Sequence, residues 1–152
     1  MLAGLWHVSF TVSDLDRSLA FYRDLLGLEL IHAQEQANEY TRRLVGYADA
    51  HLRVAMMRIP GAPLGLSGHH LELVEYVVPR GQRADVATKN PGAPHLAFVV
   101  RDIQAAYRRL LDAGVVFRSE PVAITEGRNR GGYTVYFLDP DGITLELSQP
   151  PA

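Results

Sequence analysis

Cysteine is absent from this chain of 152 residues. Its absence excludes disulfides, thiolate metal sites, iron–sulfur clusters and cysteine nucleophiles. Long hydrophobic runs are also missing, since every apolar run falls far short of the roughly 20 residues that cross a bilayer. The first ten residues lack the basic start and long apolar core of a secretory signal. We therefore expect a cytoplasmic protein that does not span a membrane.

Neither positive nor negative charge is present in large excess. Lys and Arg together number 15, Asp and Glu 17, and the formal net charge is −2. Such a balance favours neither a nucleic acid nor an anionic membrane as a partner. The hydrophobic fraction of 47% and the charged fraction of 21% are typical of an ordinary globular domain. The length suits one domain or a tightly fused pair of half-domains.

The order of the predicted elements repeats along the chain. In the first half, alternating hydrophobicity predicts a strand over 5–12, and helical spacing predicts a helix from an N-cap at Ser13 or Asp14 to Gly27. A short helix capped by Asn38 fits residues 38–47 better than an edge strand does. The other predicted strands of this half cover 28–32, 51–59 and 69–78, with a loop over 60–68. The second half predicts a strand over 95–100, a helix from Asp102 to Gly114, and strands over 115–125 (broken by a proline), 133–138 and 143–148.

The two halves also match at individual positions. The residues His7, Phe10, Val12 and Asp14 correspond to His95, Phe98, Val100 and Asp102, and Leu71-Glu72-Leu73 corresponds to Leu145-Glu146-Leu147. Internal repetition of this kind sets the architecture. We predict an α+β fold of two paired βαβββ modules, about 5–78 and 94–149, joined by a connector over 79–93. Their sheets are expected to form an open, barrel-like cleft.

Strand alternation indicates where the repeated polar residues point. In each half, the first strand directs its histidine away from the apolar side chains, and the last strand does the same with its glutamate. A single such residue is most often solvated, but four at repeat-equivalent positions are not independent. Two imidazoles and two carboxylates in one cleft predict a divalent metal site made of His7, Glu72, His95 and Glu146. His70 shares the face of Glu72 as a substitute or supporting ligand, whereas Trp6 is expected to pack on the helix side.

Four stretches carry a resemblance to a known family. They are His7-Val-Ser-Phe-Thr-Val-Ser-Asp-Leu-Asp-Arg-Ser-Leu-Ala-Phe-Tyr22, Leu71-Glu-Leu73, Pro94-His-Leu-Ala-Phe-Val-Val100 and Phe137-Leu-Asp-Pro-Asp-Gly-Ile-Thr-Leu-Glu-Leu147. The sequence resembles the vicinal oxygen chelate superfamily, which includes glyoxalase I, bleomycin-resistance proteins and extradiol dioxygenases. The resemblance implies a homodimer of paired βαβββ modules. In the metalloenzymes of that family the ligands come from the first and last strands of each module, which are the four residues already selected.

The resemblance also implies a reaction. One divalent ion per site (Ni, Co, Zn, Mn or Fe) would bind two vicinal oxygens of a small-molecule substrate, and a carboxylate would move a proton at the adjacent carbon. Glu146 or Glu72 is the expected base, with Glu35 and Glu39 as second choices. The favoured function is a lyase resembling glyoxalase I or an isomerase resembling methylmalonyl-CoA epimerase.

Two other functions remain open from the sequence. An iron(II) dioxygenase of the extradiol type needs one carboxylate fewer than this ligand set supplies. A metal-free, antibiotic-binding resistance protein would not need the ligands at all. Thr11 stands where glyoxalase I commonly has an arginine that holds the glutathione conjugate. Arg128 and Arg130, in a glycine-flanked loop over 127–132, are candidates for holding a carboxylate or phosphate of the substrate. No residue is assigned to an organic cofactor.

Overall fold

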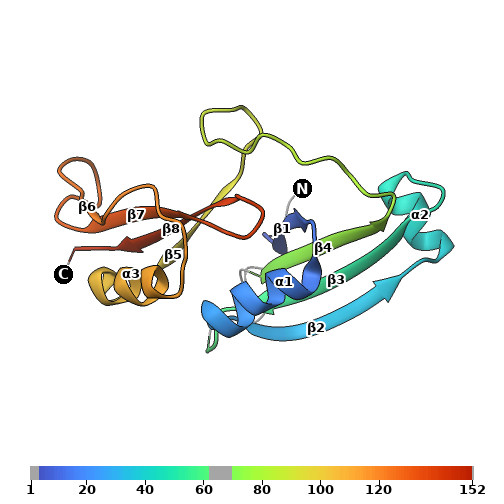
Figure 1. Ribbon diagram of the computed structural model, residues 1–152, viewed down its shortest axis with the longest axis horizontal. Coiled ribbons are helices and arrows are strands. Elements are labelled where there is room, and N and C mark those ends of the chain that lie inside the picture. Colours follow the sequence, from blue (N-terminus) through green and yellow to red (C-terminus); the bar gives the residue numbers. More distant parts are fainter. Residues whose placement is uncertain (1–3, 62–69, 152) are drawn as a thin grey trace. The chain divides into compact units, whose positions relative to one another are not determined.

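The computed structural model describes residues 4–61 and 70–151 of the chain. The chain divides into two compact units, residues 1–83 and 84–152. Each unit holds one four-stranded sheet and at least one helix (Figure 1). The predicted α+β class is therefore confirmed. Most of the predicted loop over 60–68, and the first residue of the strand predicted to follow it, lie outside the described residues.

Within residues 4–61 and 70–83, the first module contains four strands and two α-helices. Its elements in chain order are β1 (His7–Val12), α1 (Leu15–Leu19), the π-helical segment η1 (Ala20–Leu25), β2 (Glu29–Gln36), α2 (Glu39–Val45), β3 (His51–Arg58) and β4 (His70–Val78). The strands lie in the order β1-β4-β3-β2, in which β1 runs parallel to β4 and the other neighbours are antiparallel. The short helix predicted after Asn38 is confirmed, and the Asn38 side chain accepts a hydrogen bond from the Thr41 N–H.

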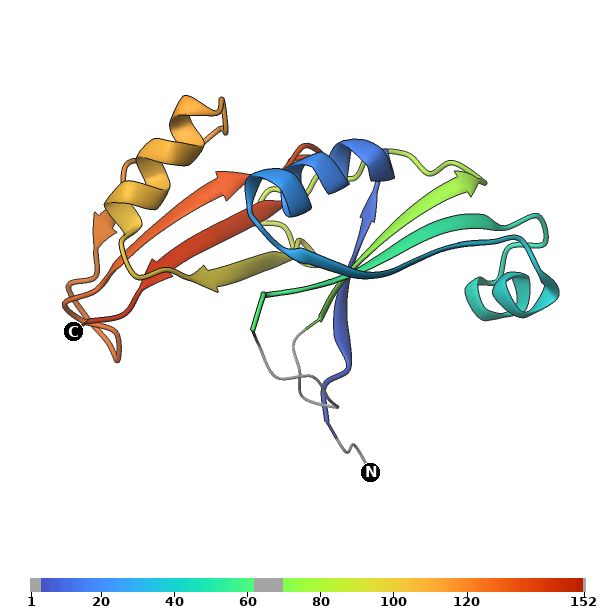
Figure 2. The ribbon, with the colours of Figure 1, turned by 90° about the horizontal axis from the view of Figure 1, so that it is seen from below.

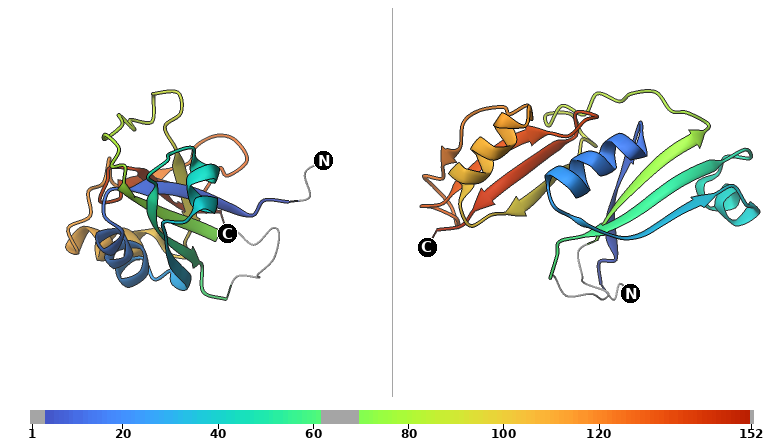
Figure 3. Two further views of the ribbon diagram at one scale, coloured as in Figure 1. Left: turned by 90° about the vertical axis from the view of Figure 1, so that its right-hand side faces the viewer. Right: turned by 60° about the horizontal axis from the view of Figure 1, so that its bottom comes forward.

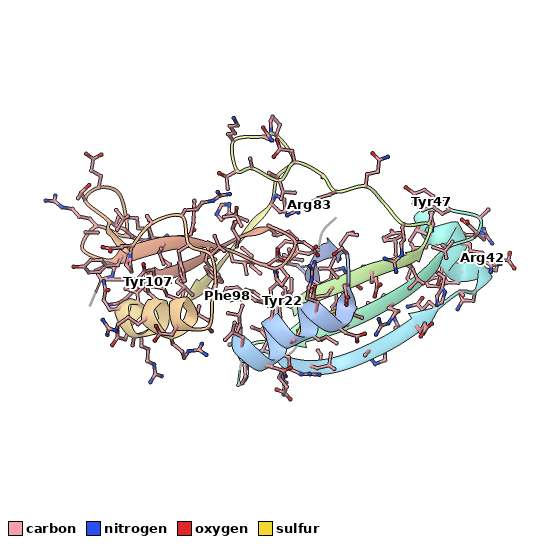
Figure 4. The ribbon with its side chains drawn as sticks, in the orientation of Figure 1. Tyr22, Arg42, Tyr47, Arg83, Phe98 and Tyr107 are labelled. Atoms are coloured by element: carbon pink, nitrogen blue, oxygen red, sulfur yellow. The ribbon has the colours of Figure 1, made fainter. Side chains whose placement is uncertain are left out.

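Local sequence explains where the first helical segment starts and stops. The Asp14 side chain accepts a hydrogen bond of 3.0 Å from the Arg17 N–H, which satisfies one of the free donors of the first turn. Gly27 ends the segment at a φ of +84°, a conformation that favours glycine. Figure 2 shows this segment against one face of the sheet, where Tyr22 is fully buried (Figure 4).

A buried carboxylate joins this helix to the sheet. The Glu75 side chain, only 7% exposed, accepts hydrogen bonds from the Leu15 N–H at 3.2 Å and from Arg53 Nη1 at 3.1 Å. Arg53 also donates to both oxygens of Asp16 on α1, the shorter bond being 2.8 Å. This helix-facing side of the sheet therefore carries an ion-pair network, and the other side is left for the polar residues of β1.

The second module repeats the plan of the first without the inserted helix. Its elements are β5 (His95–Val99), α3 (Ile103–Asp112), β6 (Val122–Ala123), β7 (Tyr133–Leu138) and β8 (Thr144–Gln149). The sheet order is β5-β8-β7-β6, with β5 parallel to β8. Figure 3 shows α3 lying along one face of this sheet, and its N-cap Asp102 accepts a hydrogen bond from the Ala105 N–H, as predicted.

The strand predicted over 115–125 is mostly wrong. Only Val122–Ala123 forms β6, and Phe117 adds an isolated bridge to Phe137. Backbone bonds from Arg118 to Tyr136 and from Leu138 to Val116 keep part of the segment beside β7. Pro121 has no N–H to donate to a ladder, which explains why a continuous strand does not form.

Candidate metal centre

The first strand of the first module separates polar from apolar side chains as predicted. Phe10 and Val12 are each 3% exposed and face the core, while Ser9 and Thr11, which alternate with them, are exposed. His7 lies on the polar side with these two residues. The sheet face that carries His7 is therefore the one opposite α1.

The structure brings the two predicted ligands of the first module together. His7 Nε2 lies 3.4 Å from Glu72 Oε2, and the side chains are 32% and 21% exposed. They meet because β1 and β4 are parallel neighbours in a register that sets Ser9 opposite Glu72. Each residue is half-buried, so both groups remain reachable from solvent.

The second module brings its own pair together in the same way. His95 Nε2 lies 3.6 Å from Glu146 Oε2, with side-chain exposures of 49% and 18%. Here β5 and β8 are the parallel neighbours, and Ala97 stands opposite Glu146. The repeat seen in the sequence is thus a repeat of the histidine–glutamate pair in three dimensions.

The separations within the pairs fit two ligands of one ion. Metal–ligand bonds of about 2.1 Å at angles of about 90–110° set neighbouring ligand atoms about 3.0–3.4 Å apart. An N–H···O hydrogen bond is shorter, at about 2.7–3.2 Å. The 3.4 Å separation of the first pair lies at the upper end of the ligand range and the 3.6 Å separation of the second just above it. His7 Nδ1 is buried and has no hydrogen-bond partner among the described residues.

Neither module completes a metal site by itself. Among its described residues, neither contains a group of three or more His, Asp or Glu side chains that could hold an ion. Each pair offers one imidazole and one carboxylate, and a metal ion bound through protein ligands generally needs three or four. Each pair alone therefore supplies only part of a ligand set.

The surroundings of the two glutamates differ. Thr134 Oγ1 on β7 donates a hydrogen bond of 2.6 Å to Glu146 Oε1, and the Leu147 carbonyl, at 3.2 Å, is its other acceptor. The His95 ring also lies 5.7 Å from that of Tyr136, measured between centroids. Glu72 receives no hydrogen bond from any of the described residues, and Met56 stands opposite it on β3. The sequence analysis did not identify Thr134. The one feature that points to it is its position two residues before Tyr136, which stands opposite Glu146 across the sheet.

His70 lies beside the first pair without joining it. It is 8% exposed and stands opposite His7 in the β1–β4 register. Neither ring nitrogen has a hydrogen-bond partner among the described residues. Its ring contacts that of Trp6 edge-on, with the centroids 5.9 Å apart. The expectation that Trp6 packs on the helix side is wrong: it is 54% exposed, and it precedes β1, so strand alternation does not govern it.

The polar face of the first module forms a cavity of about 930 Å³. His7 and Glu72 line it, together with β2, β3 and the inserted helix α2. Figure 4 labels Arg42 and Tyr47 at this end of the sheet, on α2 and just after it. The hydroxyl and amide side chains among its lining residues are Ser9, Thr11, Gln34, Gln36, Asn38, Tyr40, Thr41 and Tyr76. None of the described lining residues is Lys or Arg.

The remaining candidates lie on other elements than the two pairs do. Glu35 borders the cavity, but it stands opposite Arg53 in the β2–β3 register, and its carboxylate pairs with His51 at 2.5 Å. Arg53 points to α1, so this register puts the Glu35 side chain on the helix-facing side. Glu39 begins α2 and is exposed, and Arg128 and Arg130 lie exposed in the loop before β7.

Arginine side chains lower the pKa values of two surface carboxylates of the first module. A hydrogen bond from Arg53 lowers the pKa of Asp16, and one from Arg58 lowers that of Glu29. Both carboxylates lie at the surface and act in ion pairs of the first module. These shifts concern stability and not the chemistry of the His–Glu pairs.

The fold and the repeated pairs define a class of protein, in which each of two βαβββ units sets a histidine and a glutamate on one sheet face. A family model for the Glyoxalase/Bleomycin resistance protein/Dioxygenase superfamily matches residues 4–147. The chain belongs to this superfamily, as its resemblance predicted. Among the described residues, no helix is long and apolar enough to cross a membrane.

Individual relatives include enzymes. The chain is 37% identical over 150 residues to a 2-epi-5-epi-valiolone epimerase from an Actinomyces species, covering 96% of this chain and 79% of that protein. It is 29% identical over 146 residues to a probable lactoylglutathione lyase from Vibrio cholerae, covering 94% and 88%. A solved glyoxalase family protein from Bacillus cereus shares the fold, with a TM-score of 0.83, 23% identity and coverage of 100% and 97%.

Proposed function

We propose that this protein is a divalent-metal-dependent epimerase, which moves a proton at the carbon beside a carbonyl group of its substrate. The observation that carries the proposal is the repeated pair, with separations of 3.4 Å in the first module and 3.6 Å in the second. Together His7, Glu72, His95 and Glu146 would supply two imidazoles and two carboxylates. Ni, Co, Zn, Mn and Fe all accept such a set.

The chemistry follows from this donor set. A divalent ion supplies a Lewis acid that stabilises negative charge developing on the substrate oxygen. The imidazoles and carboxylates would hold it, and a carboxylate beside the substrate would take the proton from the adjacent carbon. The carboxylates that line or border the cavity in the first module are Glu72 and Glu35. Since the register turns Glu35 to the other face, Glu72 is the one available to a substrate in that cavity.

The lining of the cavity supports a neutral substrate. Its hydroxyl and amide groups suit the oxygens of a hydroxylated carbonyl compound, and its described residues offer no cationic side chain. A glutathione conjugate carries carboxylates and a CoA thioester carries phosphates, groups that proteins usually bind with arginine or lysine. The epimerase relative is named for 2-epi-5-epi-valiolone, and the ending "-one" denotes a ketone. We therefore favour a ketone of this kind as the substrate.

A second candidate is a lyase of the lactoylglutathione type, which the Vibrio cholerae relative favours. Against it stand Thr11, in place of an arginine, and the absence of Lys and Arg from the described cavity lining. Arg128 and Arg130 remain candidates for holding an anionic substrate, and they would gain importance if the lyase reaction were found.

The test begins with metal content. The protein, purified without a metal-binding tag, is stripped with a chelator and reloaded with one divalent ion at a time. About one equivalent per chain is expected, with loss in His7→Ala and His95→Ala. His32→Ala, a change of an exposed histidine outside the pairs, is the matched control and should bind normally. Failure of every ion to bind wild-type protein would refute the proposal.

The reaction is then identified by isotope exchange in D₂O. The loaded protein is incubated separately with 2-epi-5-epi-valiolone, with the hemithioacetal of glutathione and methylglyoxal, and with methylmalonyl-CoA. NMR and mass spectrometry follow the deuterium and the configuration of the carbon. Deuterium entry with inversion in the neutral ketone supports the epimerase. Turnover of the hemithioacetal alone would instead establish the lyase, and turnover of methylmalonyl-CoA alone would show that the substrate is anionic.

A further inference from the structure

The two glutamates of the candidate centre are equally buried but unequally held. Their side chains are 21% exposed for Glu72 and 18% for Glu146, so burial does not distinguish them. Hydrogen bonding does. Oε1 of Glu146 accepts the 2.6 Å bond from Thr134, whereas the described residues give Glu72 no hydrogen bond and only the ion-pair contact with His7, at 3.4 Å.

This difference arises from one residue on the neighbouring strand of each sheet. In the second module Tyr136 stands opposite Glu146, and Thr134, two residues earlier, stands opposite Ser148. In the first module Met56 stands opposite Glu72, and Val54 occupies the position that corresponds to Thr134, opposite Val74. Valine and threonine have nearly the same shape, so the hydroxyl is the main difference.

We infer that the two glutamates have different tasks: Thr134 positions Glu146 as a fixed ligand, and Glu72 is the carboxylate that exchanges a proton with the substrate. This inference rests on the function proposed above. A hydroxyl bonded to a carboxylate forms a short, strong, charge-assisted hydrogen bond, which fixes the carboxylate's orientation. Such supporting contacts orient ligands and strengthen metal binding.

Glu72 has the opposite properties. No donor among the described residues restrains it, and it lines the cavity of the first module. Its carboxylate can therefore turn between His7 and a substrate without breaking a hydrogen bond. In the proton transfer, the C–H bond beside the carbonyl breaks, the proton passes to a Glu72 oxygen, and the electron pair stays on the substrate as an enolate. A proton from water then adds to the opposite face of that carbon, and the proton held by Glu72 passes to the hydroxide left behind, which completes the epimerisation and restores the carboxylate.

A reciprocal pair of substitutions tests this division. Thr134→Val removes the hydroxyl from Glu146, and Thr134→Ser keeps it; Val54→Thr places a hydroxyl where it can reach Glu72. The first readout is the Kd for one ion, such as Co²⁺, measured by competition with a chromogenic chelator. The second is the rate of solvent-deuterium entry at saturating metal.

The expected results differ for each variant. Thr134→Val should raise the Kd about 10- to 100-fold, and Thr134→Ser should bind as the wild type does. Val54→Thr should leave the Kd within about threefold and slow deuterium entry about tenfold or more, which is part of the roughly 10²- to 10⁴-fold that a proton-transferring group contributes. Glu72→Gln should abolish exchange while still binding the ion, and Glu146→Gln should lose the ion. Circular dichroism verifies folding, and if Val54→Thr fails to fold, the two Thr134 variants and the two glutamine variants decide.

Failure of the inference can be told from failure of the proposed function. Wild-type protein that binds no ion contradicts both. Wild-type protein that binds an ion and exchanges deuterium, combined with an unchanged Kd in Thr134→Val, overturns the role of Thr134 alone. Normal exchange in Glu72→Gln overturns the assignment of the base and leaves the metal centre standing.

Discussion

Replacing Arg53 with methionine tests how the first module is held together. Methionine keeps most of the side-chain length but removes the charge that pairs with the buried Glu75 carboxylate. Breaking a buried ion pair by removing one partner costs about 3–5 kcal/mol. The Leu15 N–H still bonds Glu75, and Arg80 Nη2 lies 3.8 Å from its Oε1. These remaining contacts place the expected loss in free energy of unfolding at the lower end, about 3 kcal/mol.

The controls separate the buried half of this network from its exposed half. Asp16→Asn removes the partner of Arg53 that is 73% exposed, so it should lower the free energy of unfolding much less than Arg53→Met does. The double variant Arg53→Met/Glu75→Gln should recover much of the loss, because no unpaired buried charge remains.

Urea denaturation measures the free energy of unfolding in each case. The fluorescence of Trp6, the single tryptophan, reports the first module, while far-UV circular dichroism reports the whole chain. If Arg53→Met lowers the stability no more than Asp16→Asn does, then Glu75 does not depend on Arg53 and the reasoning is wrong.

Two further predictions concern stability. Because ion pairs lower the pKa values of Asp16 and Glu29 in the folded state, their stabilisation is present above the ordinary carboxyl pKa and is lost as the pH falls below about 4. Urea titrations across this range should show a falling free energy of unfolding, and a shallower fall in Arg58→Met; an equal slope in both proteins would contradict the assignment. Asp102→Ala removes the N-cap of α3 and should cost about 1 kcal/mol, while Asp102→Ser retains most of it. Thermal denaturation compares the two, and equal melting temperatures would show that the cap contributes nothing.

Much of the fold was predictable because local signals and the repeat agree. Asp14 and Asp102 cap the helices that the spacing of apolar residues predicts, and glycines end them. That His7 and Glu72 share one sheet face, as do His95 and Glu146, also followed from alternation, since the side of a strand fixes the face of a sheet. Parallel pairing of the first and last strands then brings each pair within contact distance.

Other features depend on contacts that a single sequence does not display. β6 is short because pairing with β7 is interrupted around Pro121, although the residues themselves favour a strand. Glu35 has a carboxylate that could act as a base, but the register of β2 against β3 turns this side chain toward the helix-facing side of the sheet. In the sequence nothing distinguishes Thr134 from any other threonine of a strand. Its role becomes visible only when β7 is known to pair with β8, the strand that carries Glu146.

The two modules have the same strand order, β1-β4-β3-β2 and β5-β8-β7-β6. Each module can therefore be compared with the other as with a homologous protein. Duplication and fusion of one ancestral module would leave this arrangement. Duplication also allows the sequence of one copy to change while the other copy keeps the inherited chemistry. Comparing the halves then acts as an alignment contained in a single gene. Positions that agree, such as His7 and His95, mark what both copies retained, and positions that differ, such as Val54 and Thr134, mark where the copies diverged.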